Sequence, residues 1–163
     1  MRNDAPLDVY LNDHLAGATF GAELADQLAE RTADTPFGEA MRELATEIEG
    51  DRETLRQLMD QLGTSRNPVK QATTWVGEKF SRVKLSGMTA GHEELGLFMA
   101  LETLSLGIEG KESLWTALEA VADCYPTLRG IDFAMLQERA RRQRKVIVDE
   151  HAAAARRTFT PTA

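Results

Sequence analysis

The sequence predicts an all-α protein, a bundle of four long helices. Apolar residues recur with alternating three- and four-residue spacing over four long stretches, which is the period of a helix that buries one face. Short segments containing Pro, Gly, Ser or Thr separate these stretches. At 163 residues the chain has the size of one domain and can bury a core without disulfides. We therefore expect a single helical domain over residues 1–163.

The first predicted helix covers residues 7–31. It begins just after Pro6, which suits a first helical turn. One ionisable side chain, His14, occupies a core position on its apolar face. That face consists of Leu7, Leu11, His14, Ala18, Gly21, Ala25 and Leu28. Because the middle of this face is small, we expect a partner helix to approach it closely.

The second predicted helix covers residues 36–62, with Thr35 as its N-cap, Pro36 in its first turn and Gly63 after its end. Its apolar face is interrupted chemically only by Asp51. Since only a short turn separates them, the first two helices should be antiparallel. Counting from the turn places His14 and Asp51 within one helical turn of the same level. We expect the two side chains to lie close enough to interact.

Residues 64–93 differ in character from the rest of the chain. A shorter amphipathic helix is predicted over 69–85, between two loops rich in Gly and Ser, and its polar face is basic. At about 1.5 Å per helical residue, this segment is long enough to run the length of a neighbouring helix. We interpret it as a crossover connection between two antiparallel helical hairpins.

The third predicted helix, residues 94–123, is apolar on two sides, with Glu102 and Glu109 on the second side. Such a helix is buried on both faces, either by the crossover segment or by another subunit. We therefore expect a homodimer or higher homo-oligomer that buries residues of this helix. The candidates are Leu97, Leu101, Leu104 and Trp115. The fourth predicted helix, residues 132–158, carries Gln143 and His151 on its apolar face.

Two hairpins joined by a full-length crossover are the connectivity of ferritin-like bundles. Over roughly residues 7–158 the chain resembles the ferritin-like superfamily, most closely in EIEGDRETL (47–55) and LETLSLGIEGK (101–111). Metal-binding members carry a Glu on the first and third helices and a Glu-x-x-His on the second and fourth.

The resemblance implies a ligand role for Glu47, for Glu102 or Glu109, and for Glu150. The two histidines of the pattern are missing, because Gly50 and Ala153 occupy their positions. The chain is therefore expected to have lost the standard di-iron ligand set. A non-standard site for Fe, Mn or Zn is the alternative. Its candidate ligands are His14, Glu47, Asp51, Glu102, Glu109, Glu150 and His151.

A purely structural role for these ionisable residues is the favoured hypothesis, with no cofactor bound. A buried carboxylate is satisfied equally well by a cation or an amide. The available partners are Arg52, Lys111, Gln143 and Arg144. We therefore expect a non-catalytic helical protein.

Composition excludes several other functions. The chain has 19 Lys and Arg against 26 Asp and Glu, a net charge of −7, so it is not expected to bind nucleic acid as a whole. A basic run on the fourth helix leaves binding to DNA or another anionic surface as a further alternative. That run consists of Arg139, Arg141, Arg142, Arg144, Lys145, Arg156 and Arg157. A single cysteine, Cys124, and the lack of a signal peptide or of a long apolar run predict a cytoplasmic protein with no membrane contact.

Overall fold

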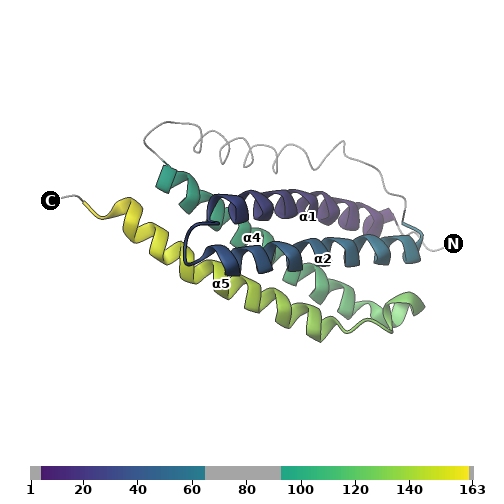
Figure 1. Cartoon of the computed structure of the whole chain (residues 1–163). Helices are drawn as coiled ribbons and strands as arrows, with labels where there is room; N and C mark the ends of the chain where they lie inside the picture. Colours follow the sequence, from purple (N-terminus) through teal and green to yellow (C-terminus); the bar gives the residue numbers. More distant parts are fainter. Residues whose placement is uncertain (1–4, 65–92, 162–163) are drawn as a thin grey trace.

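The computed structural model describes residues 5–64 and 93–161, and every regular element in these ranges is a helix (Figure 1). The four long helices are α1 (Ala5–Arg31), α2 (Gly38–Leu62), α4 (Glu93–Ala120) and α5 (Phe133–Phe159). Two short 3-10 helices, η1 (Ala122–Cys124) and η2 (Pro126–Leu128), connect α4 to α5. The prediction of an all-α bundle of four long helices is confirmed for the described part of the chain. The helix predicted over 69–85 lies outside the described residues.

The start of α2 was predicted two residues too early. Pro36 belongs to a tight turn, and α2 begins at Gly38 with Phe37 as its N-cap. The turn is held by its own hydrogen bonds, since Thr35 N–H donates to Thr32 O at 2.9 Å and Gly38 N–H donates to Thr35 O at 3.0 Å. Thr35 therefore stabilises the turn and does not cap the helix. At the other end of α2 the predicted stop is confirmed, because Gly63 adopts the left-handed conformation with φ 72°.

The helices pack as two pairs, α1 with α2 and α4 with α5, and α1 also packs on α4 (Figure 1). The start of α4 lies beside the ends of two other helices. The Arg31 guanidinium donates to Glu93 O, and Arg157 Nε donates to Glu94 Oε2 at 3.1 Å. Thus α4 begins at the end of the bundle where α1 and α5 finish.

The apolar core forms two clusters along the bundle. One contains Leu24, Leu28, Met41, Leu101 and Leu104, all of them at most 2% exposed. The other contains Leu11, Leu55, Met59, Trp115 and Leu128, all of them at most 1% exposed. On α2, α4 and α5 the residues between the two clusters are polar, and this polar layer is the candidate site.

The described helices of this one chain already bury much of the doubly apolar helix α4. Leu101, Leu104 and Trp115 are each at most 2% exposed. These three candidates are therefore buried within one chain without a partner subunit, and the homo-oligomer itself stays a prediction. Among the described residues of α4, Leu106 remains 46% exposed.

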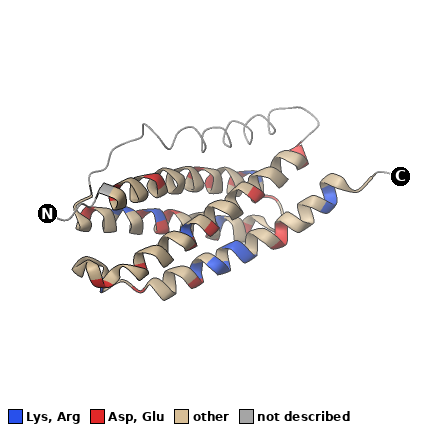
Figure 2. Cartoon of the chain, turned by 180° about the vertical axis from the view of Figure 1, so that it is seen from behind, with Lys and Arg blue, Asp and Glu red and all other residues tan. Residues whose placement is uncertain are grey.

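Basic side chains gather along α5, as Figure 2 shows in blue. Most of them pair with a carboxylate on another helix or on α5 itself. The pairs are Arg139–Asp51, Arg141–Glu112, Arg142–Glu47, Arg144–Glu109, Lys145–Asp149 and Arg157–Glu94. Apart from Arg139–Asp51, whose carboxylate is buried, these pairs are partly or largely exposed and contribute little to stability individually, but together they neutralise much of the helix's positive charge. Within the described residues, no helix is sufficiently long and apolar to cross a lipid bilayer.

Candidate functional site: a buried polar layer and an adjoining cavity

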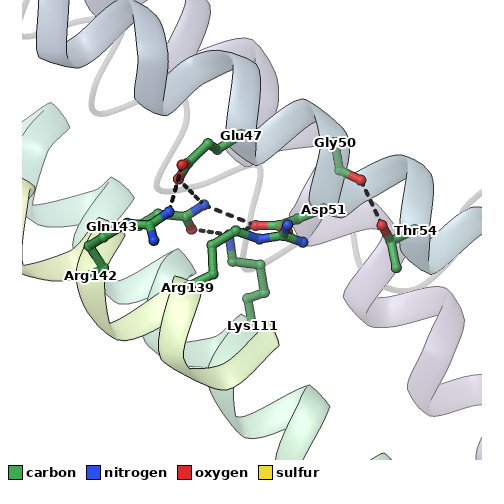
Figure 3. A network of polar contacts seen from close by, with 8 residues as sticks. All are labelled: Glu47, Gly50, Asp51, Thr54, Lys111, Arg139, Arg142 and Gln143. Atoms are coloured by element: carbon green, nitrogen blue, oxygen red, sulfur yellow. Dashed lines mark hydrogen bonds and ion pairs between the residues drawn. The ribbon is translucent and has the colours of Figure 1, made fainter. Parts of the chain in front are cut away.

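Asp51 of α2 is the centre of the polar layer. It is 3% exposed, and side chains of two other helices contact its carboxylate (Figure 3). Its Oδ2 accepts hydrogen bonds from Lys111 Nζ of α4 at 2.5 Å and from Gln143 Nε2 of α5 at 3.1 Å. Arg139 of α5 forms an ion pair with the other oxygen, Oδ1. One buried carboxylate is therefore neutralised by two cations.

Gln143 orients this network. It is 1% exposed, and its Oε1 accepts from Lys111 Nζ at 2.5 Å. Its Nε2 donates to Asp51 and also to Glu47 Oε2 at 3.0 Å, while Arg142 donates to Glu47 Oε1 at 2.6 Å. Every amide atom of Gln143 thus has a partner, and α2, α4 and α5 are joined at one level.

Burial lowers the pKa of Lys111, because water no longer solvates its ammonium group. The Asp51 carboxylate opposes this shift by its charge and its hydrogen bond, and the Arg139 guanidinium adds to it. The charged state of Lys111 therefore depends on Asp51.

The expected contact between His14 and Asp51 does not form. Asp51 uses its oxygens for Lys111, Arg139 and Gln143, whereas the His14 ring packs edge-on against Tyr10 with centroids 4.5 Å apart. The prediction was wrong because it matched the levels of two helices without allowing for the longer cationic side chains, which reach Asp51 from α4 and α5. Burial lowers the pKa of His14, and the nearby charge of Asp13 opposes this shift.

The lowered pKa of His14 predicts a pH dependence of stability. Since the folded state binds the proton more weakly, the unfolded state holds more protons near and below pH 6.5, so stability falls as the pH falls through this range. We expect the free energy of unfolding of the wild type, measured with urea, to fall more between pH 7.5 and pH 5 than that of His14→Gln, which shares every other titrating group. Equal losses in the two proteins would contradict this assignment.

The remaining candidate ligands are dispersed. Glu109 lies on the surface and pairs with Arg144 at 3.1 Å, while the inward position on α4 belongs to Lys111. Glu102 approaches His151 at 3.5 Å, and the His151 ring stacks on Phe98. Glu150 accepts a hydrogen bond from Arg157 at 2.8 Å. Within 5–64 and 93–161, no three His, Cys, Asp or Glu side chains lie close enough together to hold a metal ion.

A cavity of about 500 Å³ adjoins the polar layer between α1, α2 and α4. It is lined in part by Gly17 and Gly21 of α1 and by Gly107 and Gly110 of α4. We predicted that the small residues of α1 would allow a partner helix to approach closely, and this stays a prediction. The space that their missing side chains would fill remains open. The same glycines in the sequence were the only signal for this cavity.

No protein-family model, curated protein or solved structure matches this chain.

Proposed function

We propose that the protein is a non-catalytic helical bundle of the ferritin-like type, in which protein cations occupy the central layer of the bundle. The observation that carries this proposal is the neutralisation of Asp51 by both Lys111 and Arg139. Asp51 belongs to the EIEGDRETL segment, in which metal-binding ferritin-like proteins place ligands. Here an ammonium and a guanidinium group balance the carboxylate charge that a metal ion would otherwise balance.

The ends of the helices support the ferritin-like connectivity. Leu58 and Met59, near the end of α2, belong to the same apolar cluster as Leu11 near the start of α1. Glu93, at the start of α4, contacts Arg31 at the end of α1. Thus α2 finishes at one end of the bundle and α4 begins at the other, which is the arrangement of helix ends that a crossover connection requires.

The charges of the layer disfavour a divalent cation. A metal bound at Asp51 would lie within a few ångströms of the Lys111 ammonium and the Arg139 guanidinium, and like charges at such distances repel strongly in a poorly solvated core. Glu47, the nearest further carboxylate, already accepts hydrogen bonds from Arg142 and Gln143. A metal would have to displace cations that are covalently part of the chain.

A thermal shift experiment tests this proposal. We expect the melting temperature of the wild type to be unchanged by Fe²⁺, Mn²⁺ or Zn²⁺, and elemental analysis of protein purified without chelator to find no stoichiometric metal. A ligand that binds only the folded state stabilises it by mass action, so a metal site would raise the melting temperature. A rise that is abolished in both Asp51→Asn and Glu47→Gln would refute the proposal, since each variant removes one carboxylate of the layer.

Two further expectations remain predictions. A homo-oligomer would use apolar side chains other than the buried ones of α4, and exposed candidates exist on three of the described helices, including Val9 of α1 at 59% exposure. They include Leu106 of α4 and Val148 and Phe159 of α5, which are 46%, 42% and 58% exposed. Binding of an anionic surface through α5 is the weaker alternative, because so many of its basic side chains already pair with carboxylates.

A further inference from the structure

The cavity between α1, α2 and α4 has the size and composition of a ligand site. Small-molecule sites enclose roughly 300 to 1,000 Å³, with mostly apolar walls and a few polar groups that fix orientation. This cavity, at about 500 Å³, lies within that range. We propose that it binds an elongated apolar molecule that carries one acidic group, a class that includes medium-chain carboxylic acids. The proposal does not depend on the ferritin-like assignment.

The walls are apolar and extend along the bundle axis. On α4 the lining residues span Thr103 to Trp115, a rise of about 18 Å at 1.5 Å per residue. Side chains from both core clusters contribute to the walls. These are Leu24, Ile48, Leu55, Leu104, Ile108, Leu114 and Trp115. An elongated shape with apolar walls fits an alkyl chain or a flat hydrocarbon.

Glycine makes room for such a molecule. A Cβ built at Gly17, Gly21, Gly107 or Gly110 meets no other atom within 4 Å. Glycine in a helix interior costs stability relative to alanine, and no close backbone contact requires it at these four positions. The four residues lie on the facing sides of α1 and α4 that line the cavity. Their presence keeps open a volume that ordinary side chains would fill.

The polar groups at the cavity favour an anion. Lys111 and Asp51 both line it, and Asp51 shares its single negative charge between Lys111 and Arg139. Among residues 5–64 and 93–161 the Lys111 ammonium donates to two acceptors, Asp51 Oδ2 and Gln143 Oε1, and an ammonium group has a third donor that a ligand could use. A second lining cation, Arg52, pairs with the exposed Glu49 on its own helix and with no other carboxylate of the described residues. The other lining carboxylate, Asp13, is exposed, so in the buried layer an acidic headgroup at Lys111 would balance the positive charge that Asp51 leaves uncompensated.

The cavity is accessible from solvent. Three of its lining residues, Asp13 of α1 and Leu106 and Gly107 of α4, are exposed. Leu106, at 46% exposure, is one of the large apolar side chains that the described bundle leaves uncovered. A ligand can therefore enter between α1 and α4 while its headgroup approaches Lys111.

Three probes that differ only in headgroup test the proposal on the full chain: dodecanoate, dodecanol and dodecyltrimethylammonium, each below its micelle concentration. We expect calorimetry to detect binding of one dodecanoate, with about tenfold weaker binding of dodecanol and weaker binding still of the cation, because only the anion gains the charge interaction. In the single-tryptophan variant Trp75→Phe, dodecanoate should change the fluorescence of Trp115, which lines the cavity. Absence of dodecanoate binding would overturn the proposal, and equal binding of all three probes would show only detergent-like adsorption.

Variants that fill the cavity locate the site. Gly21→Leu and Gly110→Leu add volume where a Cβ meets nothing, so each should weaken dodecanoate binding by about tenfold or more while the helical circular dichroism signal is retained. Gly50→Leu is the matched control, because Gly50 is an exposed α2 residue that does not line the cavity. Lys111→Met should abolish the preference for dodecanoate over dodecanol. Unchanged affinity in both filling variants would place binding elsewhere and refute this site.

Discussion

Asp51→Asn is expected to lower the free energy of unfolding by about 3 kcal/mol, the largest effect of any single polar substitution in the described chain. Removal of one partner of a buried ion pair typically costs about 3–5 kcal/mol, because the remaining charge is left uncompensated. Here two cations lose their counter-charge. We place the loss at the lower end of that range, because the side chains of Lys111 and Arg139 retain 14% and 25% exposure and can reach some water. Urea unfolding of wild type and variant at pH 7 measures this difference.

The same variant should recover stability as the pH rises. Without the carboxylate, burial and the Arg139 charge both lower the pKa of Lys111 in the folded state, so the unfolded state holds the extra proton. Stability then increases with pH until the unfolded lysine also loses its proton near 10.5. The wild type should show a smaller increase, because the Asp51 carboxylate opposes the lowering of the Lys111 pKa.

Two controls separate the buried charge from a general effect of removing acid from α2. Glu53→Gln changes an exposed carboxylate of the same helix and should alter stability by less than about 0.5 kcal/mol. In the double variant Asp51→Asn with Lys111→Met, one of the uncompensated cations is gone, so the loss should be smaller than the sum of the two single losses. Strict additivity would mean that Asp51 and Lys111 do not stabilise one another.

The polar layer was predictable in part from the sequence. The interruption of an apolar face identified Asp51, and Lys111 and Gln143 were among the side chains expected to satisfy a buried carboxylate, as both do for Asp51 in the structure. Arg139 was counted only as part of a basic run. Sequence periodicity gives the face and the level of a residue, but it does not say which of several nearby side chains will reach a charge. For that reason Arg139 and Lys111 occupy the place assigned to His14.

The cavity was not predictable from the small residues of α1. Glycine on an apolar face is compatible with two outcomes, a close approach of helices or an open space between them. The separation of two helix axes is set by the largest side chains between them, and both flanking clusters contain large ones, such as Leu11 with Trp115 and Leu24 with Leu104. Large side chains of this kind flank the glycines of α1 and α4, and a Cβ at Gly17 meets no atom within 4 Å, as expected where large neighbours set the spacing. Local sequence does not contain this long-range constraint.

Gly38→Ala is expected to lower the free energy of unfolding by about 2–3 kcal/mol, although alanine is the better helix former. Gly38 is the first residue of α2 and is buried against the turn that precedes it. An added Cβ would overlap the carbonyl oxygen of Thr32 and lie only 2.8 Å from that of Ala33, and both are backbone atoms. They cannot move freely, because Thr32 and Thr35 fix the turn through side-chain hydrogen bonds of 2.8 and 2.7 Å to backbone carbonyls. Overpacking against rigid atoms typically costs about 1–3 kcal/mol, and the turn hydrogen bonds are lost with any shift that relieves it.

Gly50→Ala is the matched control for this effect, since it makes the same substitution on the same helix. Gly50 is exposed, and a Cβ there meets no atom within 4 Å, so only helix propensity changes. We expect this variant to be more stable than the wild type by about 0.5–1 kcal/mol. Measured with urea at one pH, the free energy of unfolding should therefore be lower than that of the wild type for Gly38→Ala and higher for Gly50→Ala. If Gly38→Ala also gained stability, the turn between α1 and α2 would have to be looser than its hydrogen bonds indicate, and the start of α2 would not be fixed by close backbone contact.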